Sequence, residues 1–446
     1  MDRRIVSALM KWKKSASRKP LLLRGARQVG KTYTLRAFGE QNFDHTIYLN
    51  LENPSDANLF RHSTSFQELW EILPLYAKQK LVPGKTLLII DEIQAAPSAL
   101  NMLRFFYESQ PDLHVACAGS LLEAMIAREG LQIPVGRVQY LYMFPMTFSE
   151  FLRAGNRELA DYLASCTDFS GVSSSLHQEC MRYFKYYLLI GGMPEVVKGY
   201  WGGTSISDLA PIYESLMTGF MDDIHKYASS AEAKYLRLVL QHAPRFAGTR
   251  IKYENFANSG YRSRDMKRAF DLLVATNLVT CVSGCPSRGL PLTPNLKKSP
   301  KLLFLDVGLV NYASEMRHEI LQAEAVESLY KGRITEQAVG QQLLALNAQR
   351  RQDVHYWYRD KPGSVAEVDF ILTHQGRIYP IEVKAGKTGV LRSVHTYMNE
   401  AETECAFRIH SGRYDQNEIA TRNGKRFTLT SCPFYLMERL LSMPDA

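Results

Sequence analysis

The chain has 446 residues, which is too many for a single hydrophobic core, so two to four domains are expected. Hydrophobic residues make up 46% and charged residues 22%, a composition that excludes disordered and fibrous classes and is typical of a folded, water-soluble protein. The net charge of +9 permits an anionic partner such as nucleic acid without requiring one.

Targeting and cross-linking signals are not found. Residues 1–18 are basic and amphipathic but lack the apolar core and cleavage site of a signal peptide, and no apolar run reaches the length of a membrane span. The seven cysteines are scattered, and Cys281 and Cys285 have no second pair at ligand spacing. We therefore expect a reduced, cytoplasmic protein without disulfides, structural zinc or a membrane partner.

A glycine-bounded loop is the first motif with defined chemistry. It consists of Gly25, Ala26, Arg27, Gln28, Val29, Gly30, Lys31 and Thr32, between an apolar run and a helical stretch. This context is that of a P-loop, whose backbone N–H groups point at phosphate oxygens. Lys31 is expected to reach the β- and γ-phosphates of ATP, and the Thr32 hydroxyl to ligate Mg²⁺. A surface turn is the alternative, and the flanking elements argue against it.

Apolar runs alternate with amphipathic stretches over the first third of the chain. The runs cover residues 21–23, 46–51, 86–90, 113–118 and 138–143, and the stretches include 66–80 and 99–109. Such alternation predicts a parallel sheet covered by helices on both faces. The third run ends at Asp91 and Glu92. Asp91 is expected to hold Mg²⁺ through its water shell, and Glu92 to orient the attacking water, although a solvated turn is also a common setting for two such acids.

Ser120 and Arg137 flank the last two of these runs. In ATPases of the AAA+ type a polar residue at the position of Ser120 senses the γ-phosphate, whereas a helix N-cap is the alternative. Arg137 could stabilise phosphate charge within its own chain or across a subunit interface, or be an ordinary surface arginine.

These motifs resemble those of a widespread group of prokaryotic ATPases. The matching segments are 24–32, 91–94, 118–120, 136–137 and 145–150. Members of the group join an AAA-type (AAA+) domain to a C-terminal nuclease-like domain of unknown function. Because the C-terminal signatures described below also fit, the resemblance covers essentially the whole chain. It implies an ATPase fold and chemistry, and subunits that could form an AAA+ ring or a smaller homo-oligomer.

The pattern from residue 147 to 227 is helical, with Gly/Ser-rich breaks at 170–175 and 202–205. The aromatic run 183–187 predicts core packing rather than a ligand cage. A helical subdomain that follows an AAA-type core is expected to cap the nucleotide and to couple its hydrolysis to movement.

Three short helices and two strands are predicted next, at 234–241, 253–258, 264–273, 278–282 and 301–305. This is the element order of a winged helix. Its third helix and wing would expose cations suited to DNA phosphate contacts, namely Arg262, Arg264, Lys267, Arg268, Lys297, Lys298 and Lys301. A merely solvated face, or a winged helix that binds protein, is the alternative.

The last third alternates predicted helices and strands. The helices are expected at 331–348 and 390–400, and the strands at 354–358, 365–372, 377–383 and 405–409. This order resembles the core of the PD-(D/E)xK nuclease superfamily. Because side chains alternate along a strand, Glu382 and Lys384 share a face, and Asp369 on the neighbouring strand could meet them. Two such carboxylates suit a bridging Mg²⁺ or Mn²⁺, with Lys384 positioning the hydrolytic water. Glu336 lies on an apolar helix face, where some of these nucleases carry a further metal-ligating Glu.

The sequence therefore predicts an α/β protein in four parts. These are a P-loop AAA+ ATPase domain (1–155), a helical lid (156–228), a winged helix (229–310) and a PD-(D/E)xK nuclease-like domain (311–446). The predicted function is ATP hydrolysis coupled to action on DNA, with metal-dependent endonuclease cleavage, for example of branched DNA. The alternative is a signal-transducing regulatory ATPase whose C-terminal domain binds nucleic acid or protein without cleaving. The acids at Asp91 and Glu92 disfavour a non-enzymatic adaptor.

Overall fold

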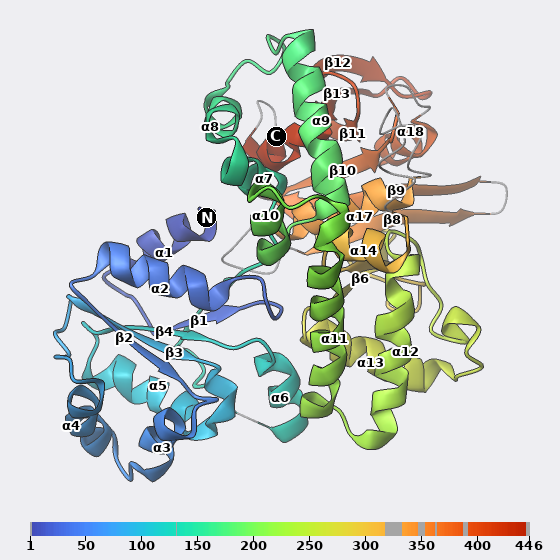
Figure 1. The fold of residues 1–446 in the computed structure, drawn as a ribbon. Helices are drawn as coiled ribbons and strands as arrows, with labels where there is room; N and C mark the ends of the chain where they lie inside the picture. The colour runs from blue at the N-terminus through green and yellow to red at the C-terminus, as the bar shows by residue number, and fades with distance from the viewer. Residues whose placement is uncertain are drawn as a thin grey trace.

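The computed structural model describes residues 2–130, 132–316, 332–346, 353–361, 364–386 and 391–442. The N-terminal third, blue to cyan in Figure 1, folds around one sheet, and the remainder combines long helices with a second sheet. The predicted helix ends at Lys331, Ala348 and Val390 lie outside the described residues.

The first sheet has five parallel strands in the order β2-β3-β4-β1-β5, which confirms the predicted parallel α/β architecture. The strands are β1 (Leu21–Arg24), β2 (His45–Asn50), β3 (Thr86–Asp91), β4 (His114–Ala118) and β5 (Gln139–Tyr142). Since all five run the same way, the loops after β1, β3 and β4 meet at one edge of the sheet.

Helices cover both faces of this sheet. Alternate strand residues point to opposite sides, so Leu21 and Leu23 pack towards α1 (Ile5–Lys14) and α2 (Lys31–Asn42). Leu22 and Leu88 pack instead with the helices of the other face (Figure 1). Those helices are α3 (Pro54–His62), α4 (Phe66–Ala77) and α5 (Pro97–Ser109). The short 3-10 helix Ile93–Ala95 and α6 (Leu122–Glu129) lie in the connections after β3 and β4.

A run of helices joins the two sheets. They are α7 (Phe148–Gly155), α8 (Arg157–Ser165), α9 (Ser174–Ile190), α10 (Pro194–Trp201), α11 (Ala210–Tyr227), α12 (Ser230–Phe246) and α13 (Ser263–Ala275). Helix α14 (Val307–Ala313) comes later in the chain and packs against α9 and α12. Within the aromatic run of α9, Phe184 and Tyr187 are buried against Phe148, with ring centroids 5.4 and 5.9 Å away. These rings are core residues, as their pattern predicts.

The second sheet has eight strands in the order β12-β13-β11-β10-β9-β8-β6-β7. The strands are β6 (Val279–Cys285), β7 (Lys301–Phe304), β8 (Val354–Lys361), β9 (Ser364–His374), β10 (Arg377–Val383), β11 (Cys405–His410), β12 (Asp415–Ala420) and β13 (Arg426–Pro433). Helices α17 (Arg333–Leu344) and α18 (Arg392–Met398) and a final 3-10 helix, Phe434–Ser442, complete the part of this region that the structure describes.

The segment expected to be a winged helix is built into this second sheet. Strand β6 pairs with β7 and, in parallel, with β8 through Ser283 and His355. The predicted middle helix is only a short 3-10 turn, Phe256–Asn258. The winged-helix assignment is therefore not confirmed, because its two strands form the edge of the C-terminal sheet rather than a wing of their own. Across the described ranges, no helix combines the length and apolar character needed to cross a membrane.

Candidate nucleotide site and a buried carboxylate–lysine cluster

The loop between β1 and α2 has the backbone of a phosphate cradle. Gly25 and Gly30 have φ values of +146° and +93°, which favour glycine. A Cβ on Gly25 would come within 2.1 Å of the Met143 carbonyl oxygen, so no larger residue fits there. Helix α2 begins directly after Gly30, so its free N–H groups face the loop. Backbone and helix together form a site for an anionic phosphate.

Lys31 is buried and directed into this cradle. Its Nζ donates hydrogen bonds to the carbonyl oxygens of Gly25 at 2.9 Å and Ala26 at 2.7 Å. Burial lowers the pKa of Lys31 to about 8, and Glu92 and Asp91 only partly offset that effect. A bound triphosphate would supply the negative charge that this ammonium lacks.

Asp91 connects the end of β3 to the P-loop. Its Oδ2 accepts hydrogen bonds from the Thr32 hydroxyl at 2.6 Å and from the Tyr48 hydroxyl at 3.0 Å. Burial, followed by the charge of Asp91, raises the pKa of Tyr48, which therefore stays a donor. A hydroxyl and a carboxylate at hydrogen-bond distance beside a phosphate cradle are oxygen ligands of the type that Mg²⁺ prefers. These residues fit ATP with Mg²⁺.

Glu92 is held beside Asp91 by two neighbours. Its Oε2 accepts a hydrogen bond of 2.6 Å from Gln94 and a longer one of 3.4 Å from the Ser120 hydroxyl. Its own φ of +48° is uncommon for a residue other than glycine. Ser120, predicted as a phosphate sensor, thus contacts Glu92 in the described structure. Gln94 was not among the predicted site residues, although it lies in segment 91–94, one of the segments that carry the family resemblance.

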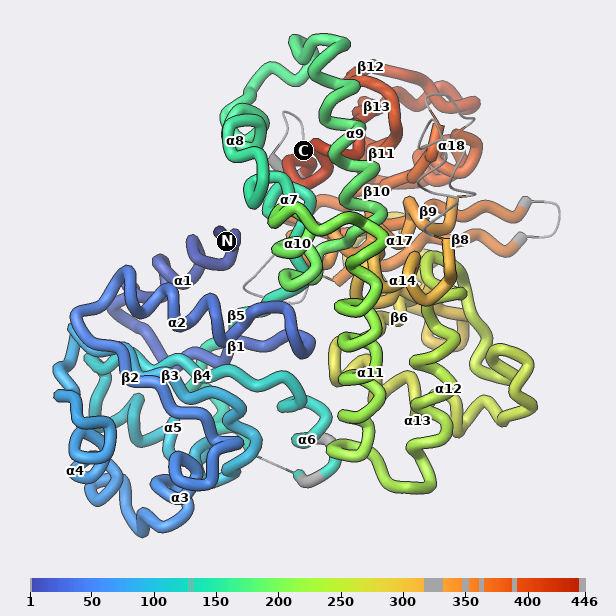
Figure 2. Tube along the Cα trace, viewed as in Figure 1, coloured from blue at the N-terminus to red at the C-terminus, as the bar shows by residue number. Residues whose placement is uncertain are grey.

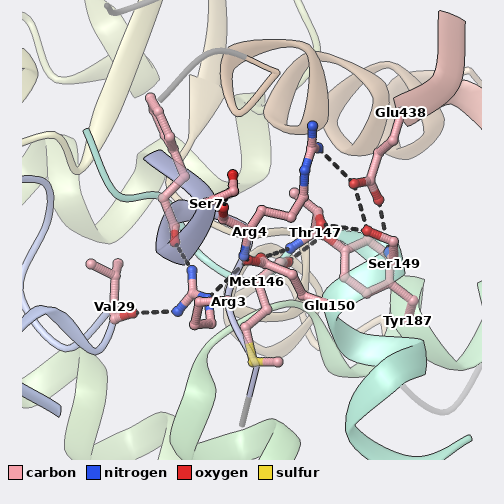
Figure 3. A network of polar contacts seen from close by, with 11 residues as sticks. Arg3, Arg4, Ser7, Val29, Met146, Thr147, Ser149, Glu150, Tyr187 and Glu438 are labelled. Atoms are coloured by element: carbon pink, nitrogen blue, oxygen red, sulfur yellow. Dashed lines mark hydrogen bonds and ion pairs between the residues drawn. The ribbon is translucent and has the colours of Figure 1, made fainter. Parts of the chain in front are cut away.

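Arg3 secures the P-loop from outside the motif. Its guanidinium donates to the carbonyl oxygens of Val29 at 2.7 Å and Phe144 at 2.6 Å, and its Nε pairs with Glu150 at 3.1 Å (Figure 3). Both charged side chains are less than one-tenth exposed. No local pattern in the sequence marks Arg3, because all its partners lie in distant segments.

The same network extends to the end of the described chain (Figure 3). The Arg4 backbone N–H donates to Glu150 at 2.7 Å, and the Arg4 guanidinium pairs with Glu438 at 2.8 Å. Glu438 also accepts from the Ser149 N–H and hydroxyl, both at 2.7 Å. The N-terminal residues therefore link the P-loop, the start of α7 and the final 3-10 helix.

Helix α11 approaches the P-loop from the other side. Figure 2 shows the loop between β1 and α2 beside α11, and Arg27 forms an ion pair with Asp223 in the last turns of this helix. Lys226 also pairs with Asp223, at 3.2 Å. Arg27 is therefore held by a helix of the predicted lid segment.

Arg137 lies away from the nucleotide site of its own chain. Its Nε pairs with Glu108 on α5 at 2.8 Å, and it lines a shallow cavity of about 560 Å³ with Arg104 and Phe105 rather than with P-loop residues. In this structure α5 therefore holds the Arg137 guanidinium. Action of Arg137 on phosphate, within its own chain or across a subunit interface, stays a prediction.

The seven predicted DNA-contacting cations do not form one exposed group. Lys267, Arg268 and Lys298 are ion-paired with Asp271, Glu232 and Asp360, respectively. Lys301 is 2% exposed, so its expected exposure on a wing is wrong. Arg262, Arg264 and Lys297 are exposed, and no described residue forms an ion pair with them.

Lys301 is instead surrounded by the acids of the nuclease-like region. Its Nζ lies 2.6 Å from Glu336, 3.4 Å from Glu367 and 3.5 Å from Asp369. Burial alone would lower the pKa of Lys301, but these three carboxylates together raise it. Burial, followed by repulsion from Asp369, raises the pKa of Glu336, because several acids share one ammonium.

The predicted trio is brought together on β9 and β10, with Lys384 just beyond the end of β10. The Lys384 ammonium lies 2.6 Å from Glu382, and the Val383 N–H donates to Asp369 at 2.8 Å. Burial, followed by the charge of Asp369, raises the pKa of Glu382. Within the described ranges no group of three acids, histidines or cysteines is arranged to hold a metal ion. The residues therefore do not fit the predicted Mg²⁺ or Mn²⁺ here, since lysine ammoniums take up the carboxylates.

Family models match three parts of the chain. Residues 17–152 match a model described as an AAA domain. Residues 181–319 and 331–435 match two models described as domains of unknown function, DUF8612 and DUF4143, so the nuclease-like assignment is not confirmed. No curated protein matches the chain in sequence.

Similar solved structures are distant. The Walker-type ATPase PABY2304 of Pyrococcus abyssi is 16% identical, with a TM-score of 0.44, 70% of this chain and 95% of that chain being covered. The Thermotoga maritima RuvB Holliday junction branch migration motor is 14% identical, with a TM-score of 0.30, and the match covers 67% of this chain and 93% of that chain. The Aeropyrum pernix Orc1 protein in complex with DNA is 14% identical, with a TM-score of 0.29 and coverage of 70% and 91%. The family model, the parallel sheet and the P-loop geometry together identify residues 17–152 as an AAA-type P-loop ATPase domain.

Proposed function

We propose that this ATPase uses ATP hydrolysis to change the position of its helical and C-terminal parts while they engage DNA. The observation that carries the proposal is the ion pair between Arg27 in the P-loop and Asp223 near the end of α11. Helix α12 follows α11 after a break of two residues and packs against α13. A change at the nucleotide therefore has a short path to α13, whose N-terminal end carries exposed arginines.

The chemistry at the nucleotide follows from the positions of four side chains. Lys31 binds the β- and γ-phosphates, and Thr32 and Asp91 hold the cation site beside them. Bound Mg²⁺ would neutralise phosphate charge as it develops. Glu92 orients the attacking water and accepts its proton, and Gln94 and Ser120 hold the Glu92 carboxylate in place.

DNA is proposed as the macromolecular partner because cations without an ion pair to any described residue lie at the end of this path. Arg262 and Arg264 are exposed at the start of α13, and Lys297 is exposed in the loop before β7. Exposed arginines without acidic partners suit phosphate contacts, which dominate affinity for DNA and make it dependent on salt.

The test measures duplex and single-stranded DNA binding over a range of salt concentrations, together with ATP turnover. Replacing Arg262 and Arg264 by Ala should lower the slope of log affinity against log salt by about one for each lost contact. Lys85→Ala is the matched control, since this lysine pairs with Asp44 in the ATPase domain. If the Arg262 and Arg264 variant keeps the wild-type slope, as the control should, then α13 does not bind DNA, and a protein becomes the proposed partner of α13 instead.

A metal-dependent endonuclease is the second candidate. It is favoured by one observation: the buried Oε2 of Glu382 has no hydrogen-bond partner among the described residues, as an atom left for a ligand would. The ammoniums of Lys301 and Lys384 count against it. We further predict assembly into an AAA+ ring or a smaller homo-oligomer, with Arg137 acting within its own chain or on a neighbouring subunit. A cytoplasmic location is also predicted.

A further inference from the structure

We propose that Lys301 is a built-in cation that takes the position expected for a metal ion in the nuclease-like cluster. The C-terminal region would then fold and act without a divalent metal, and its acids would not form a metal-dependent cleavage centre. This inference depends on neither ATP hydrolysis nor DNA binding by the protein.

The cluster formed by Lys301 and the acids around it is built from three segments of chain. The lysine is the first residue of β7, Glu336 lies in α17, and Glu367 and Asp369 lie on β9. Besides the three carboxylates, the backbone carbonyl oxygen of Asp369 accepts a hydrogen bond from Nζ at 3.2 Å. Four oxygens thus converge on one nitrogen, which is the surrounding that a buried ammonium requires.

The dimensions of this shell suit an ammonium rather than a metal. The oxygens lie 2.6 to 3.5 Å from Nζ, the range of hydrogen bonds and ion pairs. Mg²⁺ requires oxygens at about 2.0–2.1 Å, and Ca²⁺ at about 2.3–2.6 Å. A metal ion held by Glu336 and Asp369 would occupy the same few ångströms as the Lys301 ammonium, so the two cations would exclude each other there.

The Lys301 side chain is enclosed within the cluster. Its side chain is 2% exposed, and its Nζ lies 5.0 Å from the centre of the Phe370 ring and 5.9 Å from that of Tyr356. Its backbone is held by pairing with Val282 on β6 and by a bridge to Arg250. Moving the ammonium elsewhere would place a charge among apolar side chains, which is strongly unfavourable.

Other cations balance the remaining charge of the cluster. Arg250 pairs with Glu367 at 3.1 Å, and Lys384 pairs with Glu382 at 2.6 Å. Every one of the four carboxylates therefore has a cation from the chain itself, and none depends on a metal for its compensation.

The first test is Mn²⁺ binding by calorimetry to the nucleotide-free, full-length protein. Wild type is compared with Asp369→Asn, an uncharged replacement that can still accept the Val383 N–H. The proposal expects the same number of bound Mn²⁺ ions in both proteins, because any ion they share lies elsewhere. One Mn²⁺ per chain that is present in wild type and lost in Asp369→Asn would overturn it.

The second test removes the built-in cation. Lys301→Met keeps the length of the side chain without its charge, so the carboxylates that lose their cation should bind one additional Mn²⁺ per chain relative to wild type. The variant should also melt at a lower temperature than wild type and recover part of that loss when Mn²⁺ is added. A folded Lys301→Met that binds no additional Mn²⁺ would overturn the proposal. If this variant does not fold, the comparison of wild type with Asp369→Asn decides the question alone.

Discussion

The guanidinium of Arg3 donates a hydrogen bond of 2.7 Å to the carbonyl oxygen of Val29, inside the P-loop. The same side chain pairs with Glu150, which caps the start of α7, so one arginine ties the phosphate cradle to the helices beyond β5. Loops that bind phosphate depend on a fixed backbone, and this bond fixes the loop from a segment that precedes β1.

We expect Arg3→Met to weaken ATP binding and to destabilise the fold. Removing Arg3 leaves the Glu150 carboxylate buried without its cation, a change that costs about 3 kcal/mol or more of unfolding free energy. Urea unfolding and ATP titration measure the two effects. Arg4→Ala is the control, because the Arg4 side chain is 43% exposed and its ion pair should contribute about 1 kcal/mol or less. Equal losses in the two variants would contradict the role given to Arg3.

The nucleotide site makes a second prediction, about Lys31 and Glu92. Lys31→Ala should abolish ATP binding, because it removes the buried cation of the cradle. Glu92→Gln should keep binding and lose turnover by about a hundredfold or more, since an amide cannot accept the proton of the attacking water. Equilibrium binding of a labelled ATP analogue and steady-state phosphate release separate the two. Wild-type turnover in Glu92→Gln would remove Glu92 from its catalytic role.

ATP binding should weaken as the pH rises above about 8. The pKa of Lys31 is lowered to about 8 in the nucleotide-free protein, whereas bound phosphates favour its charged form. Binding must then restore a proton, so affinity should fall by up to about tenfold per pH unit above 8. Lys31→Arg is the control, since arginine stays charged and its affinity should not follow this profile. A flat wild-type profile from pH 7 to 9 would exclude the lowered pKa.

The lowered pKa of Lys31 also makes the stability of the nucleotide-free protein depend on pH. Between about pH 8 and the ordinary lysine value of 10.5, the unfolded chain retains a proton that folded Lys31 has released. Without nucleotide, the Lys31 contribution to the free energy of unfolding should therefore rise with pH across this window. Subtracting the pH profile of Lys31→Met, measured by urea unfolding, isolates that contribution, and a falling difference would contradict it.

Asp223→Asn tests the proposed path from the P-loop to α11. Asp223 is buried and pairs with both Arg27 and Lys226, so its loss should uncouple α11 from the nucleotide. We expect ATP to bind with little change, while any effect of ATP on DNA affinity is reduced severalfold. Asp222→Asn is the matched control, because Asp222 precedes Asp223 on the same helix but is exposed. If both variants retain full coupling, the path lies elsewhere.

The sequence by itself determined the nucleotide site. Its residues lie at strand ends and in one short loop, where glycine spacing and the apolar run before Asp91 specify the local backbone. Parallel strands bring their carboxyl ends to one edge, so Lys31, Thr32, Asp91 and Glu92 meet as predicted. The order of elements around Asp369 and Glu382 was also predictable, because strand and helix periodicities are local properties.

Only the tertiary structure decided which charges meet. Lys301 is 35 residues from Glu336 and 68 from Asp369, and no periodicity connects them. The position of Lys301 next to a proline-rich turn predicts that its side chain is exposed. The pairing of β6 with β8 instead brings β7 into the second sheet and buries Lys301, its first residue. The hydrogen bond from Arg3 to Val29 likewise joins residues that no local pattern connects. Local pattern sets which way a side chain points from its own element, whereas the partner it finds there depends on how distant elements pack.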